Sequence, residues 1–120
     1  AQFQHAVQTV LTRHGKHILE KQLLLARIAD NAIDLYGSLA VISRATASLN
    51  RTGGGAEGTA ERDHELLVAR TAVRQACGRV RSNNAALLAG EKRNGDEAIL
   101  HIARDVLKAG HYIAPHPLGV

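Results

Sequence analysis

The clearest pattern in this chain is an apolar row that recurs every three or four residues through its first half. The row consists of Leu25, Ile28, Ala32, Leu35, Leu39, Ile42, Thr46 and Leu49. Only an α-helix places this spacing on one face, because side chains of a strand alternate every second residue. A second apolar row runs beside it, through Ala29, Ile33, Tyr36 and Ala40. Between Leu35 and Ile42 the predicted helix is therefore apolar nearly all round, so we expect other helices to cover it on several sides.

Similar periodicity predicts further helices, and no segment shows the alternation of a strand. We expect an all-α fold, a four-helix bundle-like domain with one long central helix, with helices at residues 2–14, 17–50, 61–88 and 96–109. The expected inner stripe of the third helix is Leu66, Ala69, Val73, Ala76, Val80 and Leu87. Gly78 lies within that helix, where a close neighbouring helix would justify a glycine. The fourth helix is expected to begin at Asp96 as N-cap and to bury Ile99, Ile102, Ala103 and Val106.

Two segments lack a packing pattern. Residues 51–60 hold four glycines, which predicts a linker, and residues 111–120 hold Pro115 and Pro117, which predicts an extended tail. A chain of 120 residues is expected to form a single helical domain. It contains no Met, so we expect it to be a fragment of a longer protein.

Composition narrows the classes of partner. The formal net charge is +4, but 15 basic residues face 11 acidic ones along the chain. With two Tyr, one Phe and no Trp, the chain lacks the aromatic side chains of a base-stacking surface, so we expect no nucleic-acid binding. The longest apolar run, 35–42, is far shorter than the about 20 residues of a membrane-spanning helix.

No motif predicts an active site, and we expect no catalytic, cofactor-binding or metal-binding residue in this segment. Gly53, Gly55 and Gly58 match the letters of a dinucleotide fingerprint, but that fingerprint needs a preceding strand. The seven histidines include no pair at the spacing of a zinc helix, and Cys77 is the single cysteine. Scattered surface imidazoles and a small apolar thiol are the simpler interpretation.

Three arginines form the one candidate binding feature. Arg70, Arg74 and Arg81 follow one side of the predicted third helix, at spacings of four and seven. They form a candidate ridge for an anion, a lipid headgroup or an acidic partner. The alternative is an ordinary solvated face whose arginines pair with Asp30 and Asp34 of the central helix.

One stretch resembles a known family. The residues that carry it are Gly15-Lys16, Ile18, Glu20, Gln22-Leu23, Arg27, Ala29 and the run DLYGSLAVISRATASL from Asp34 to Leu49. Asp63-His64-Glu65, Tyr112-Ile113 and His116-Pro117-Leu118 add to it. Together they resemble the C-terminal helical domain of the mitochondrial very-long-chain acyl-CoA dehydrogenases, over nearly the whole chain. The glycine-rich loop departs from that pattern.

The resemblance implies a parent that is an FAD-dependent homodimer oxidising long-chain acyl-CoA in fatty acid β-oxidation. The flavin and the catalytic residue then belong to upstream dehydrogenase domains, and this segment alone is not an enzyme. For the C-terminal domain itself, the resemblance implies a role in stabilising the dimer. It also implies docking to anionic lipid on the matrix side of the mitochondrial inner membrane, or to a partner. An alternative stays open: Gly37, the run 63–67 and the tail are nearer the paralogue that acts in respiratory complex I assembly.

Overall fold

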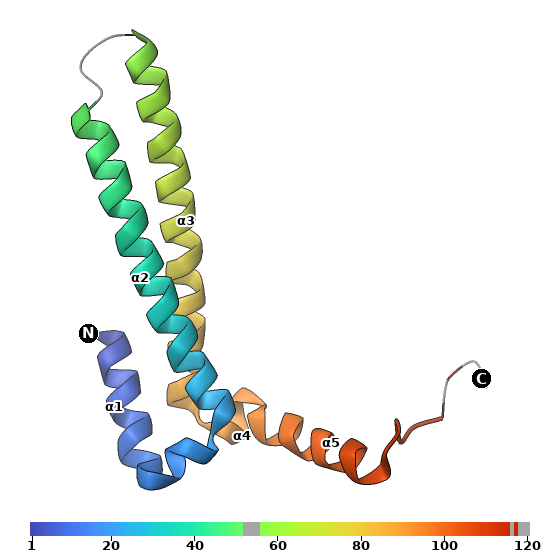
Figure 1. The fold of residues 1–120 in the computed structure, drawn as a ribbon. Coiled ribbons are helices and arrows are strands. Elements are labelled where there is room, and N and C mark those ends of the chain that lie inside the picture. The colour runs from blue at the N-terminus through green and yellow to red at the C-terminus, as the bar shows by residue number, and fades with distance from the viewer. Residues whose placement is uncertain (52–55, 116, 118–120) are drawn as a thin grey trace. The chain divides into compact units, whose positions relative to one another are not determined.

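The computed structural model describes residues 1–51, 56–115 and 117. Its elements, shown in Figure 1, are α1 (Gln2–His14), a 3₁₀-helix η1 (Gly15–Glu20), α2 (Gln22–Arg51), α3 (Ala56–Ala89), α4 (Glu91–Asn94) and α5 (Asp96–Ala109). The described residues contain no strand, so the predicted all-α class is confirmed. The number of helices differs, because a 3₁₀-helix precedes α2 and a single turn, α4, precedes α5.

The predicted start of the long helix at residue 17 is wrong. Gly15 has a φ of +52°, a conformation that glycine adopts without steric cost, and it ends α1 at the predicted residue, His14. The chain then tightens into the 3₁₀-helix up to Glu20, so α2 begins only at Gln22.

The predicted linker at 51–60 is also too long. Arg51 still belongs to α2, and α3 already begins at Ala56, so Gly58 is helical. A single glycine costs a helix only about 1 kcal/mol, which helix packing readily offsets. The remaining residues of this prediction, 52–55, lie outside the described part of the chain.

The chain divides into two compact units, Ala1–Leu88 and Ala89–Val120, and the single helical domain stays a prediction. In the second unit, Gly90 and Gly95 both have positive φ and bound the short α4. The N-cap of α5 is Gly95 rather than Asp96, and Oδ1 of Asn94 accepts a hydrogen bond from the backbone N–H of Asp96 at 2.9 Å. Gly110 ends α5 in the left-handed conformation.

The core of the first unit lies where α1, η1, the start of α2 and the end of α3 meet. It consists of five buried side chains, Ala6, Val10, Ile18, Leu24 and Leu87. Arg13 strengthens this end, since its guanidinium donates a hydrogen bond to the carbonyl oxygen of Leu88 at 3.3 Å. Figure 1 shows α1 beside this end of α2, while the rest of the α2–α3 hairpin extends beyond it.

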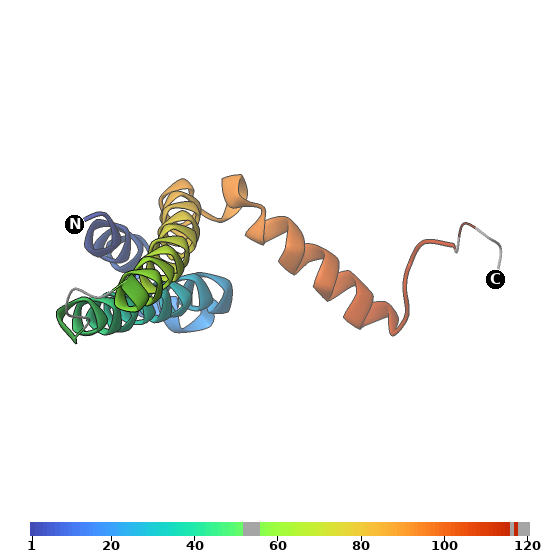
Figure 2. The same ribbon diagram turned by 90° about the horizontal axis from the view of Figure 1, so that it is seen from above.

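The seam between α2 and α3 consists of small and polar side chains. The buried residues of α2 along it are Asn31, Ala45 and Ser48, and those of α3 are Ala69, Ala76 and Asn84. They lie 14 and three residues apart in α2 and seven and eight residues apart in α3, spacings that return to one face of each helix. Figure 2 shows the two helices from above, side by side as in Figure 1.

The large apolar residues of α2 therefore flank the seam, and the predicted cover of the stretch 35–42 is wrong for this chain. Ile33, Tyr36 and Leu39 are 68%, 77% and 67% exposed. The physical reason is that small side chains allow the closest approach of two helices. The row with the bulkiest side chains therefore lies outside the contact between α2 and α3. These side chains lie uncovered on the hairpin.

Two further packing predictions fail in the same way. An added Cβ at Gly78 would meet no atom within 4 Å, so no helix in the described part of the chain approaches it closely. In α5, Ile99 and Ile102 are 54% and 62% exposed, and Ala103 is exposed as well, so the predicted burial of that face does not occur.

Candidate functional site

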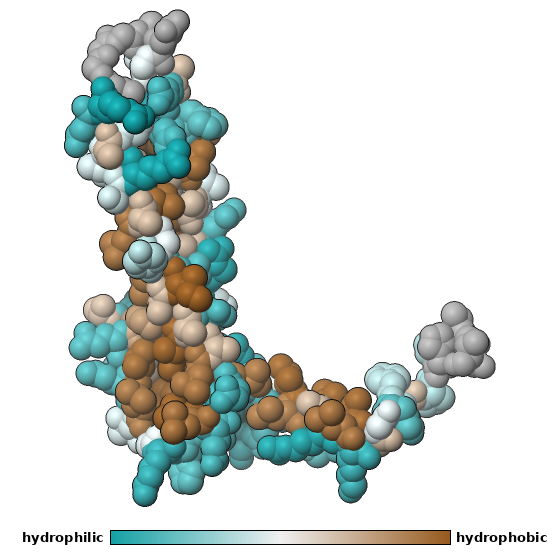
Figure 3. Space-filling view, in the orientation of Figure 1, coloured by the Kyte–Doolittle hydropathy of each residue, from teal (hydrophilic) through white to brown (hydrophobic). Residues whose placement is uncertain are grey.

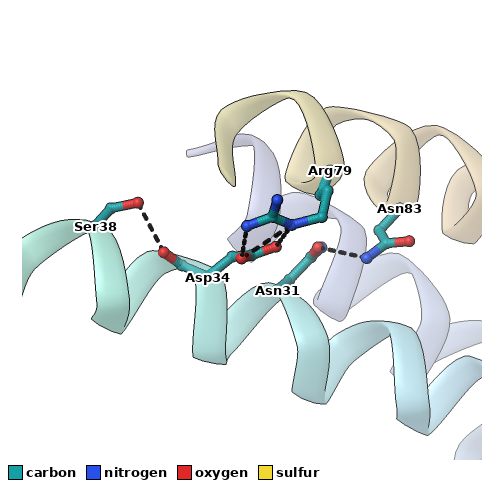
Figure 4. A network of polar contacts seen from close by, with 5 residues as sticks. All are labelled: Asn31, Asp34, Ser38, Arg79 and Asn83. Atoms are coloured by element: carbon teal, nitrogen blue, oxygen red, sulfur yellow. Dashed lines mark hydrogen bonds and ion pairs between the residues drawn. The ribbon is translucent and has the colours of Figure 1, made fainter. Parts of the chain in front are cut away.

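A buried polar layer links α2 to α3. Asn31 is fully buried, and its Nδ2 donates a hydrogen bond to Oδ1 of Asn84 at 2.9 Å. Asn83 donates in turn to Oδ1 of Asn31 at 3.1 Å (Figure 4). Because a buried amide is costly without partners, this pairing favours one register of the two helices over shifted ones.

One helical turn away, Asp34 and Arg79 form an ion pair across the same seam (Figure 4). The guanidinium is bidentate: Nη2 donates to Oδ1 at 2.6 Å and Nε donates to Oδ2 at 2.9 Å. The hydrogen bonds from Arg79 lower the pKa of Asp34, and Asp34 raises the pKa of Arg79. Both groups therefore stay charged at neutral pH, and the pair is a structural contact.

Two more ion pairs continue along this side of the hairpin. Arg44 lies 3.2 Å from Glu65, and Arg51 lies 3.4 Å from Glu61. Each pair joins α2 to α3. We call this side the paired face, because its arginines meet carboxylates of the facing helix.

The other side carries the predicted ridge. Arg70, Arg74 and Arg81 are all exposed on α3, and no residue in the described part of the chain forms an ion pair with any of them. The alternative that they neutralise Asp30 and Asp34 is not supported, since Asp34 pairs with Arg79 and Asp30 is exposed.

The three arginines border two cavities between the helices. A cavity of about 440 Å³ has Arg70 and Arg74 in its lining, and one of about 510 Å³ has Arg81 and the exposed Cys77. Ile42 and Val73 line both cavities, so the two adjoin. We call this combined surface the arginine groove.

The described residues hold no cluster of three or more potential metal-ligating His, Cys, Asp or Glu side chains. His17 lies 3.9 Å from Glu20 and His101 lies 3.5 Å from Asp105, each within one exposed helical stretch. Within the same residues, no helix combines the length and the apolar character needed to cross a membrane.

Comparison with known proteins then decides the family. The profile described as "ACAD9/ACADV, C-terminal domain" matches residues 1–112. The chain belongs to this family. It is the C-terminal domain of an acyl-CoA dehydrogenase of the ACAD9/ACADV type, as the resemblance implied.

The relatives are mitochondrial very long-chain specific acyl-CoA dehydrogenases. The human protein is 34% identical to this chain over 119 residues, the bovine protein 33% over 119 and the mouse protein 33% over 123. The alignments cover 98%, 98% and 99% of this chain but only 17% of each relative. The match therefore concerns one domain of a much longer enzyme.

Sequence patterns placed Arg70, Arg74 and Arg81 on one helix, but they missed the polar layer and the Asp34–Arg79 pair. Asn31 lies three residues after Ile28 and Asn84 three residues before Leu87, so each interrupts an apolar helical face, and that interruption was the available signal. Their pairing depends on how α3 is aligned against α2, which no spacing within one helix specifies.

Proposed function

We propose that this chain is the non-catalytic C-terminal domain of a mitochondrial very-long-chain-type acyl-CoA dehydrogenase. The parent would be an FAD-dependent oxidoreductase that acts on long-chain acyl-CoA in fatty acid β-oxidation. Its FAD and catalytic residues would belong to other domains of the same chain. The domain would stabilise the homodimer and dock it to the matrix side of the inner membrane or to a partner.

The observation that supports this role most directly is the two-faced helix α5. Its apolar residues, Ala98, Ile99, Leu100, Ile102, Ala103, Val106 and Leu107, share one side, and its charged residues share the other (Figure 3). Ile102 and Leu107 are 62% and 81% exposed. A helix with such a face needs a covering surface, and the other domains of the parent dehydrogenase supply one in the proposal.

The double variant Ile99→Glu/Ile102→Glu in the full-length protein tests this role. We expect a lower melting temperature and dissociation of the dimer, because charges would enter the docked face. Turnover per bound flavin in the protein that remains assembled should stay unchanged. Analytical ultracentrifugation, thermal melting and flavin absorbance give these three readouts.

The matched control is His101→Glu/Arg104→Glu, which places the same residues on the charged face of α5. We expect this control to keep the dimer and its melting temperature. A double isoleucine variant that behaves like the control would contradict docking through α5.

A second candidate role is that of an interaction module in the paralogue that acts in respiratory complex I assembly. The observation that favours it is the arginine groove, whose cations lack carboxylate partners in the described residues. Deleting residues 1–120 from the parent distinguishes the two roles. Loss of assembled complex I with retained acyl-CoA oxidation would favour the second.

A further inference from the structure

The arginine groove is an open furrow between α2 and α3, lined by apolar side chains of both helices. Its apolar lining includes Leu35, Leu39 and Ile42 from α2 and Val73 and Val80 from α3. Leu39 is 67% and Ile42 49% exposed, so the lining is open to an incoming apolar face. Figure 3 shows apolar side chains continuing along the hairpin surface.

The length of the groove suits a helix of about four turns. Its α2 side runs from Leu35 to Leu49, a separation that corresponds to about 21 Å along a helix axis. An open furrow between two helices accepts a third amphipathic helix, which inserts side chains at spacings of three and four residues.

The charge of the groove determines which helix fits. Arg70 and Arg74 border one end and Arg81 the other, all on the α3 side. On the paired face, by contrast, Arg44 and Arg79 already meet Glu65 and Asp34. The groove therefore presents uncompensated positive charge beside apolar surface, and it attracts an acidic helix while repelling a basic one. This charge also disfavours a second copy of the same groove as the occupant.

We propose that the arginine groove binds an amphipathic α-helix of a separate protein, with acidic residues along one flank of its apolar face. The carboxylates pair with Arg70, Arg74 and Arg81, while the apolar side chains cover Leu39 and Ile42. This inference rests on the docking role proposed above, and it names the chemistry of the partner.

Synthetic peptides of 18 residues test the proposal against the full-length protein. One probe is an amphipathic helix with leucines on one face and glutamates along its flank, and the other carries lysines in place of the glutamates. We expect the acidic probe alone to bind, with an affinity that falls as salt rises. Fluorescence anisotropy of the labelled peptides measures both affinities.

A matched pair of triple variants locates the binding site. Arg70→Gln/Arg74→Gln/Arg81→Gln should weaken binding of the acidic probe by about tenfold or more. The control triple, Arg62→Gln/Arg93→Gln/Arg104→Gln, removes the same charge from exposed positions outside the groove and should bind as the wild type does. Leu39→Asp should also abolish binding without removing an arginine.

Several results would overturn the proposal. These are equal binding of acidic and basic probes, equal effects of the two triple variants, or no peptide binding while cardiolipin-containing vesicles bind through the same arginines. A groove triple that instead dissociates the dimer would assign this face to the parent enzyme itself. That last result overturns the helix site and leaves the proposed role in dimer stability intact.

Discussion

At the residue scale, the size of an apolar side chain is a poor guide to its burial in this domain. Leu87 is fully buried, whereas Leu39, the same residue type in an equally periodic row, is 67% exposed. The two leucines differ in the neighbours of their side chains. Leu87 belongs to the core cluster with Val10 and Leu24, whereas Leu39 lines the open arginine groove.

The first prediction compares these two leucines. In the isolated chain, Leu87→Ala should lower the free energy of unfolding by about 2–5 kcal/mol, because it leaves a cavity among fixed neighbours. Leu39→Ala should change it by no more than about 0.5 kcal/mol, as a surface substitution does. Urea unfolding followed by circular dichroism measures both, and equal losses would show that the Leu39 face is covered in solution.

The second prediction concerns Asp34 and pH. Arg79 lowers the pKa of Asp34 in the folded chain, so the folded state favours the carboxylate. The stability gained is present above the unfolded pKa of about 3.9 and is lost as pH falls through the lower folded value. Asp34→Asn should therefore destabilise the chain near neutral pH, with a difference from the wild type that shrinks in acid.

Unfolding titrations between neutral pH and acid provide the measurement. Asp30→Asn, an exposed position one turn before Asp34, is the control and should keep the pH dependence of the wild type. If the loss in Asp34→Asn were the same at every pH, the ion pair would not be its source.

At the element scale, the α2–α3 hairpin is held by small side chains and buried amides. Ala45, Ala69 and Ala76 allow the helices to approach, and Asn31 with Asn84 favours their register. Apolar periodicity predicted both long helices, and for α3 it included the buried Ala69 and Ala76 in the inner stripe. For α2 it assigned the contact to a neighbouring row. A small-residue row and a large-residue row share the same spacing, so periodicity alone does not tell them apart.

The third prediction tests this seam by overpacking. Ala76 is 6% exposed, so Ala76→Leu should force the helices apart and cost about 1–3 kcal/mol. Ala40→Leu adds the same volume at an exposed position of α2 and should cost little. A melting temperature for Ala76→Leu equal to that of the control would indicate that the helices do not meet at Ala76.

At the scale of the whole molecule, the two units leave more apolar surface uncovered than a self-sufficient domain needs. Leu39 and Tyr36 on the hairpin and Ile102 and Leu107 on α5 are each more than half exposed. Exposed apolar area of this extent is typical of surfaces that meet another protein or another domain. The chain spans only 17% of the bovine and human relatives, so in those proteins the matching domain is one part of a much longer chain.

The fourth prediction follows from this surface. The isolated chain should bind an apolar dye such as anilinonaphthalene sulfonate and self-associate as its concentration rises. The full-length protein should bind less dye per copy of this domain, because docking covers part of the surface. Dye fluorescence of the two proteins, compared per mole, is the measurement; equal fluorescence would mean that the parent leaves these faces open.

The sequence by itself determined the helical class, the end of α1 at Gly15, the position of α5 and the family. Each of these depends on local spacing, on the conformational freedom of glycine or on residues that match a family directly. The shared helix of Arg70, Arg74 and Arg81 was predicted in the same way, while their role as a binding ridge stays a prediction.

Only the tertiary structure decided which faces meet. The choice of the small-residue seam and the pairing of Asp34 with Arg79 both depend on how one helix lies against another. Apolar burial has no direction, so several faces of α2 satisfy it about equally. One face of α2 is selected because the alanines allow close approach and because the buried Asn31 finds hydrogen-bond partners there. The larger apolar faces stay exposed.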